Sequence, residues 1–223
     1  MSGLADRSLQ EAMLSAASLV GSPLAFDTDS APADPLVLLD TWLRDAVAAG
    51  VAEPRAMTLA TVDVHGDPSA RVLILRDVTP DGLVFATDGR SGKVRDLEVR
   101  ARAAVTLWWQ PVVRQVRARG SVRRLPDADS ARDFLVRSPD TRAAALASRP
   151  GEMLHARREL VEAIVQARAR IEDEPGLVLE DWQAWVVEPD EVEFWQGDPD
   201  RAHTRLVYRR EDDGRWSRGL RWP

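Results

Sequence analysis

The chain has 223 residues, of which 44% are hydrophobic and 30% charged, and its net charge at pH 7 is −6. This length suits one domain or a domain with an extension, and the acidic balance argues against a general nucleic-acid binder, which would normally be basic. The absence of cysteine excludes disulfides and thiolate chemistry, and no run approaches the roughly 18–20 apolar residues of a membrane span.

The first 33 residues are rich in Ser, Ala, Asp and Pro. Such a composition predicts a flexible N-terminal extension at 1–33, with a short helix near 7–19. The mildly apolar stretch within it contains Glu11 and has no strong basic n-region, so we expect no signal peptide and a cytoplasmic location. Residues 34–223 are then predicted to form a single domain.

That domain is expected to open with a helix. Asp34 suits the N-cap and Pro35 the first helical position. Leu39, Leu43 and Val47 recur at helical spacing and predict its apolar stripe.

Turn signals divide the rest of the chain into short strands with helices between them. Expected strands cover 56–64, 69–78, 83–87, 103–109, 112–124, 181–187, 191–196, 203–210 and 215–222. Expected helices cover 91–100, 127–136, 140–147 and 152–171. The pattern predicts a mainly β, α+β fold, a small antiparallel barrel with peripheral helices.

Three groups of polar residues are candidates for binding. Beyond the turn 197–200, Arg201, His203 and Arg205 follow at two-residue spacing, which places them on one face of an extended segment. Two guanidiniums that flank an imidazole suit an anionic ligand with a titratable group beside it. Charged strand faces also commonly just meet water, so the spacing alone leaves both readings open.

The second group lies at the ends of an apolar strand, Arg71-Val72-Leu-Ile-Leu-Arg76. We expect this strand to be mostly buried, and its terminal arginines either to extend toward water or to hold an anion.

The third group is a glycine-containing loop that leads into a helix and contains Thr87, Ser91 and Lys93. Exposed amides at a helix start attract phosphate. Lys93 is the only lysine of the chain, and it opposes the helix dipole unless an anion is bound there.

Together these segments resemble the pyridoxamine 5′-phosphate oxidase family. Phe194-Trp-Gln-Gly197 with Arg201-x-His203-x-Arg205 is similar to its C-terminal signature, and 71–76 is similar to its Arg-x-Val-Leu-Leu-Lys. The resemblance covers about residues 34–223. It implies an FMN-binding split β-barrel and a homodimer with two FMN molecules at the subunit interface. The implied reaction converts pyridoxamine or pyridoxine 5′-phosphate to pyridoxal 5′-phosphate, with O2 as acceptor and H2O2 as product.

The resemblance also implies roles for individual residues and no metal site. The implied FMN contacts are Arg71, Val72, Thr87, Ser91, Lys93, Gln115, Trp195 and Arg205. The implied substrate contacts are Arg76, Arg137, Thr141, Arg201 and His203, of which the last two are also the implied catalytic residues. The adjacent Trp108 and Trp109 are expected in the core or at the dimer interface.

The departures from the family pattern gather on the substrate pocket. Asp133 stands where the family has a tyrosine beside the substrate phosphate, and Arg76 replaces a lysine. A carboxylate repels a phosphate dianion, so Asp133 must point away or be neutralised by a neighbour such as Arg137 if a phosphate is to bind. Pro150-Gly151 stand where a Gln-Ser pair touches the flavin.

Two alternatives therefore stay open. One is a sibling oxidase with a different substrate, as in phenazine biosynthesis. The other is a flavin- or pyridoxal-phosphate-binding protein without turnover, against which Arg201 and His203 argue.

Overall fold

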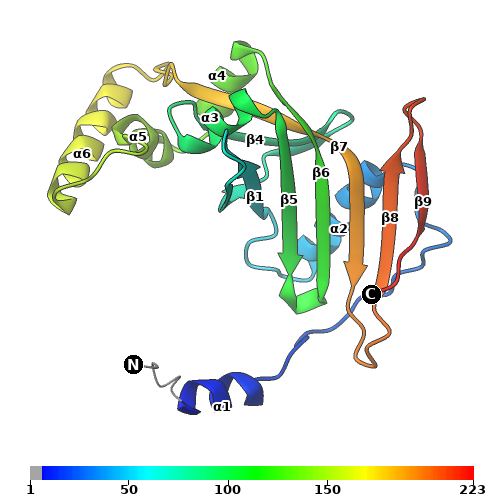
Figure 1. The fold of residues 1–223 in the computed structure, drawn as a ribbon. Coiled ribbons are helices and arrows are strands. Elements are labelled where there is room, and N and C mark those ends of the chain that lie inside the picture. The colour runs from blue at the N-terminus through cyan, green and yellow to red at the C-terminus, as the bar shows by residue number, and fades with distance from the viewer. Residues whose placement is uncertain (1–6) are drawn as a thin grey trace.

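The computed structural model describes residues 7–223, and its centre is a strongly curled antiparallel sheet of nine strands (Figure 1). Seven strands follow the order β2-β1-β5-β6-β7-β4-β3, while β8 pairs with β7 and with β9. The strands are β1 (Ala56–Val62), β2 (Pro68–Ile74), β3 (Asp77–Thr79), β4 (Gly82–Asp88), β5 (Arg102–Trp109), β6 (Arg114–Arg124), β7 (Trp182–Gln196), β8 (Thr204–Arg210) and β9 (Trp216–Leu220).

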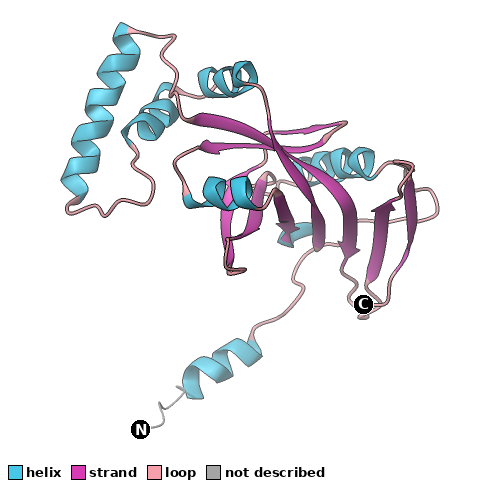
Figure 2. Ribbon diagram, turned by 45° about the horizontal axis from the view of Figure 1, so that its top comes forward, coloured by secondary structure: helices cyan, strands magenta, loops and turns pink. Residues whose placement is uncertain are grey.

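Helices surround this sheet and cover parts of it (Figure 2). They are α1 (Arg7–Ser15), α2 (Pro35–Ala48), α3 (Gly92–Val99), the 3-10 turn η1 (Gln110–Val112), α4 (Asp127–Leu135), α5 (Pro139–Ala147) and α6 (Arg157–Asp173). In both views α1 lies apart from the sheet on one side, and α5 and α6 form an arm on another. The predicted mainly β fold with peripheral helices is confirmed. Among residues 7–223, none of the helices combines the length and apolar character needed to cross a bilayer.

Helix α2 begins where its sequence predicts and closes one side of the core. The Asp34 carboxylate accepts a hydrogen bond from the Leu36 amide at 2.8 Å. The buried stripe contains Leu36, Leu38, Leu39, Trp42 and Ala46. The expected place of Val47 in that stripe was wrong, because Val47 is 61% exposed.

The sequence predicted two strands, at 181–187 and 191–196, but the structure has a single strand there, β7. It runs unbroken through Pro189, and the pairing register with β6 shifts opposite that residue, at Arg119/Gly120. A proline has no amide to donate, and a bulge is one of the few places where a central strand tolerates it. A Cβ on Gly120 would lie 1.9 Å from the Glu188 carbonyl oxygen, so the two strands approach this closely only because residue 120 is glycine.

Strand β2 is an edge strand, so the expectation that it is mostly buried was wrong. Only its inward side chains are covered, and Val72 on the other face is 65% exposed.

Backbone carbonyls of the N-terminal segment contact side chains of β6 and β8. The Ala25 carbonyl accepts a hydrogen bond from Arg114, and the Pro32 carbonyl accepts one from the Tyr208 hydroxyl. The division into 1–33 and 34–223 stays a prediction.

Candidate active site

The first part of the site is a basic cradle formed by Arg71, Thr87, Ser91 and Lys93. Arg71 points inward from β2 and donates to the Thr61 hydroxyl at 2.8 Å and to the Ser69 hydroxyl at 2.7 Å. Lys93, in the first turn of α3, donates to the Thr87 hydroxyl at 3.1 Å. The sequence placed these residues in separate segments, and the fold brings them to one place because β1, β2 and the start of α3 meet there.

The cradle contains cationic and hydroxyl groups whose bonding capacity is not filled by the protein. The Ser91 side chain is 6% exposed, and its Oγ has no hydrogen-bond partner in the described chain. Burial and the nearby charge of Arg71 lower the pKa of Lys93. A buried hydroxyl without a partner and two adjacent cations favour an anion such as a phosphate.

An open cavity of about 470 Å³ lies over Arg71 and Lys93. Its wall also contains Asp63, Asp67 and Asp96. Asp96 lies 4.0 Å from the Arg71 guanidinium and accepts a 2.6 Å hydrogen bond from Thr61. The Asp96 carboxylate therefore already has partners within the protein.

The second part of the site is the Asp133 cluster, formed by Asp133, Arg76, Arg137 and Trp182. Arg76 Nε donates to Asp133 Oδ1 at 2.6 Å, and Arg137 donates to Oδ2 at 2.9 Å. Trp182 Nε1 donates to the same Oδ2 at 2.9 Å, and the Arg137 guanidinium stacks 4.4 Å from the Trp182 ring centroid. Asp133 is thus neutralised, as the sequence required for a phosphate to bind, but by both arginines and not by Arg137 alone.

Burial alone would raise the pKa of Asp133. The hydrogen bonds from Trp182 and Arg76 and the charge of Arg137 outweigh burial, so the pKa lies below its usual range. The carboxylate is therefore ionised at neutral pH, and each arginine of the cluster already has an anionic partner.

Thr141 lies outside this network of contacts. Its hydroxyl is 2.9 Å from the Ser138 hydroxyl, and its amide donates to Ser138, which caps α5. The sequence did not indicate Trp182 as a member of the cluster. In the sequence, Trp182 is simply a tryptophan at the start of an apolar strand, and such a residue usually packs in the core.

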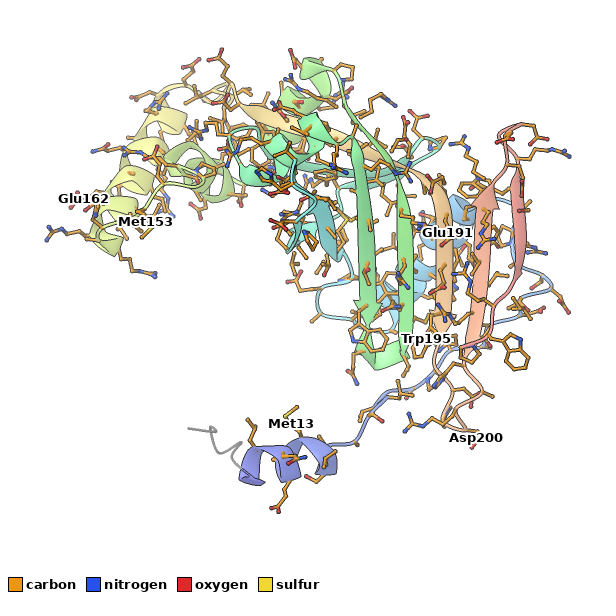
Figure 3. All side chains as sticks on the ribbon, viewed as in Figure 1. Met13, Met153, Glu162, Glu191, Trp195 and Asp200 are labelled. Carbon is orange, nitrogen blue, oxygen red and sulfur yellow. The ribbon has the colours of Figure 1, made fainter. Side chains whose placement is uncertain are left out.

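The third part of the site lies at the end of β7 and in the loop that follows (Figure 3). Trp195 faces Gln115 across the β6–β7 ladder, and its ring lies 6.0 Å from Trp108 and 5.0 Å from His203. His203 Nδ1 accepts a hydrogen bond from the Asp198 amide at 3.0 Å. This places the ring proton of the neutral imidazole on Nε2. Trp109, the other member of the predicted pair, is fully buried.

Arg201 and Arg205 have different surroundings despite their regular spacing. Arg201 is exposed, has a φ of 67° and donates to the Ser18 hydroxyl at 3.2 Å. Arg205 is held on the sheet by Glu193 at 2.7 Å and by the Trp222 carbonyl at 3.2 Å, and its buried Nε has no partner in the described chain. A non-glycine residue at positive φ is uncommon and often marks a functional loop.

Within residues 7–223, no hydrogen bond or ion pair links the cradle to the Trp195 end. Thr87 of the cradle pairs with Gln183 near the start of β7, whereas Trp195 lies near the other end of this strand of 15 residues (Figure 3). In a single chain, the predicted cofactor residues therefore form two half-sites.

Comparison with known proteins identifies the family to which this chain belongs. Residues 43–196 match the family model described as pyridoxamine 5′-phosphate oxidase. Residues 182–223 match the pyridoxine 5′-phosphate oxidase C-terminal dimerisation region.

Curated relatives agree with this match. The chain is 41% identical over 191 residues to a pyridoxine/pyridoxamine 5′-phosphate oxidase of Thermosynechococcus vestitus, which covers 85% of this chain and 89% of that protein. It is 39% identical over 183 residues to the protein of the same name from Alteromonas mediterranea, with 82% and 86% covered.

Among solved structures, PhzG from Burkholderia lata in complex with tetrahydrophenazine-1-carboxylic acid superposes with a TM-score of 0.83. It is 29% identical, and the alignment covers 91% of this chain and all of that one. The fold is thus that of the split-barrel flavoenzymes. The chain belongs to the pyridoxamine 5′-phosphate oxidase family and is an oxidoreductase of that family.

Proposed function

We propose that this chain is an FMN-dependent oxidase that acts on an amine- or alcohol-bearing carbon of a small heterocycle. When bound, FMN supplies the redox chemistry, since it accepts two electrons from the substrate carbon and returns them to O2, which yields H2O2. The chain's residues contribute binding, orientation and charge.

The observation that carries the cofactor proposal is the unsatisfied cradle. A single terminal phosphate fits Arg71, Lys93 and Thr87, and it supplies the partner that the buried Ser91 hydroxyl lacks. Gln115, Trp195 and Arg205, with the backbone near Val72, are the proposed contacts of the remainder of the cofactor. This set is sized for FMN, because it provides one phosphate site.

We propose that a homodimer completes the site. The separation of the cradle from the Trp195 end supports this, as does the match to a dimerisation region over 182–223. In such a dimer, Arg201 and His203 position the substrate beside a cofactor whose phosphate lies in the other subunit's cradle. Light scattering of the FMN-loaded protein tests this, and a strictly monomeric species with FMN fully bound would contradict it.

The names of the relatives support pyridoxamine and pyridoxine 5′-phosphate as substrates. Oxidation of either substrate at the carbon that carries the amine or alcohol gives pyridoxal 5′-phosphate, the proposed product. In this reading Arg76, Arg137 and Thr141 bind the substrate phosphate. The phosphate must then share both arginines with Asp133, which already accepts hydrogen bonds from each of them.

The Asp133 cluster favours a second candidate, an oxidase whose substrate lacks the phosphate. Two guanidiniums paired with one carboxylate retain a single net positive charge, compared with two charges if Asp133 were neutral. The structural likeness to PhzG, which binds a tricyclic carboxylic acid, is consistent with this candidate.

One assay separates the two candidates. H2O2 release by the purified yellow protein is measured with pyridoxamine 5′-phosphate, with unphosphorylated pyridoxamine and with tetrahydrophenazine-1-carboxylic acid. A low Michaelis constant for the first compound supports the vitamin-phosphate oxidase, and preference for either of the others supports the second candidate. Bound FMN without peroxide from any of them indicates a binding protein, and a colourless protein that cannot be reconstituted with FMN contradicts the proposal.

A further inference from the structure

Arg90 joins three segments of the chain that lie far apart in the sequence. Its Nε and one terminal nitrogen donate to the two Asp88 carboxylate oxygens at 2.9 and 2.6 Å. The same terminal nitrogen donates to the Ser148 carbonyl at 3.0 Å, and Nε lies 3.4 Å from an Asp181 carboxylate oxygen. Charge-assisted, two-pronged hydrogen bonds of this kind are among the stronger polar contacts in proteins.

The first segment is the turn that presents Ser91 to the cradle. Asp88 Oδ1 also accepts the Arg90 amide at 2.8 Å, and the Gly89 amide donates to the Asp181 carbonyl at 2.7 Å. A Cβ on Gly89 would lie 2.5 Å from Gln183 Nε2. The turn is therefore packed directly against the beginning of β7.

The second segment is the end of α5. Ser148 is the C-cap of this helix and begins the connection to α6. The Ser148 carbonyl accepts a hydrogen bond from Arg90. A shift of the turn at Asp88 therefore alters a contact that holds the start of the α5–α6 connection in place.

The third segment, at the start of β7, is shared with the Asp133 cluster. Asp88 pairs with Trp182 in the β4–β7 register, and Trp182 donates to Asp133. Two adjacent residues thus contact the two sites: Asp181, just before β7, contacts the cofactor turn, and Trp182, the first residue of β7, contacts the Asp133 cluster.

We propose that Arg90 is a positioning residue that couples occupancy of the cradle to order in the α5–α6 connection, residues 148–156. A phosphate in the cradle fixes the Asp88–Ser91 turn, the turn fixes the Arg90 guanidinium, and the guanidinium fixes the Ser148 carbonyl. The side chain of Arg90 is 39% exposed, so water can replace the Ser148 carbonyl as its partner when the turn is loose. Coupling of this kind is reciprocal, so loss of the Ser148 contact also weakens cofactor binding. This inference rests on the proposed FMN site.

Amide hydrogen exchange, with and without saturating FMN, tests the coupling in the wild type, Arg90→Ala and Arg90→Lys. Arg132→Ala is the matched control, because Arg132 is an exposed arginine whose only ion pair among residues 7–223 is with Asp129 in the same helix, α4. FMN affinity is measured in parallel from quenching of flavin fluorescence, and circular dichroism establishes that each variant is folded.

In the wild type and the control, FMN is expected to slow exchange in both 87–93 and 148–156. In Arg90→Ala, the FMN dissociation constant should rise about tenfold, and saturating FMN should then protect 87–93 alone. Arg90→Lys should restore part of the affinity, since an ammonium pairs with Asp88 but lacks the planar fork that also reaches Ser148.

Retained protection of 148–156 in folded Arg90→Ala would overturn the coupling, as would its absence in the wild type. Failure of the wild type to bind FMN is a different result, because it removes the proposed cofactor and this inference with it.

Discussion

Asp133 and Arg76 form a 2.6 Å ion pair between side chains that are 57 positions apart in the chain. The pair joins α4 to the segment after β2, and Arg137 and Trp182 complete the coordination of the carboxylate. The Asp133 carboxylate thereby occupies the two arginines that a substrate phosphate would otherwise contact.

The substitution Asp133→Tyr introduces the tyrosine that the family resemblance implies at this position. If the substrate lacks a phosphate, the wild type oxidises pyridoxamine 5′-phosphate poorly, and Asp133→Tyr should lower its Michaelis constant by on the order of tenfold, about 1.4 kcal/mol. The reason is that both arginines become available to the phosphate. Steady-state kinetics of both proteins make the comparison, with Asp129→Asn on the same helix as control.

Other outcomes of that comparison are equally informative. A low Michaelis constant for the wild type, left similar or improved by Asp133→Tyr, would eliminate the phosphate-free substrate. No activity of either protein with pyridoxamine 5′-phosphate would eliminate the vitamin-phosphate oxidase.

The sequence predicts local features of this molecule well and long-range pairings poorly. The Asp34 cap, the turn signals and the strand alternation depend on neighbouring residues, and the structure has the corresponding elements. The cradle segments could be singled out for the same reason, since each carries its own pattern of hydroxyls, glycines and cations.

What the sequence could not predict depends on register and tertiary contact. The sequence predicts two strands at 181–187 and 191–196, whereas β7 continues through Pro189 and a register shift at Gly120 accommodates the proline. The partners of Asp133 and Arg90 are 49 to 58 positions away in three cases, Trp182, Arg76 and Ser148. No periodic pattern connects residues at such separations.

The substitution Lys93→Ala should weaken FMN retention. It removes one of the two cations of the cradle and the donor to Thr87, and a charge-assisted contact to phosphate contributes about 1.5–3 kcal/mol, or roughly tenfold to a hundredfold in affinity. Titration of the apoprotein with FMN measures the effect. Arg100→Ala, at the exposed end of the same helix, removes an equal charge and should leave the affinity unchanged.

FMN affinity should also fall in the alkaline range. Burial and Arg71 lower the pKa of Lys93, so this lysine loses its proton below the ordinary value of about 10.4. Phosphate prefers the ammonium form, so affinity is full below the lowered pKa and declines as pH rises through it.

The free energy of unfolding responds to Lys93 in the opposite sense. The unfolded state holds the proton more tightly, so this residue's contribution to stability rises with pH between the lowered and the ordinary pKa.

Fluorescence titrations with FMN between neutral and alkaline pH measure the decline in affinity. In Lys93→Arg the decline should disappear, because a guanidinium stays protonated there. A wild-type affinity that does not change over this range would contradict the role of Lys93.

Arg201 allows the side chain and the backbone to be tested separately, because it adopts a φ of 67°. Arg201→Ala and Arg201→Gly both remove the guanidinium proposed to position the substrate, so each should lower kcat/KM at least about tenfold, or 1.4 kcal/mol. Only glycine relieves the left-handed backbone, so Arg201→Gly should be more stable than Arg201→Ala by about 1 kcal/mol.

Steady-state kinetics and thermal unfolding measure the two effects. Ser18→Ala, which removes only the hydroxyl that Arg201 contacts, should leave kcat/KM unchanged. Equal kcat/KM in all three variants and the wild type would show that Arg201 is merely a surface residue in a strained turn.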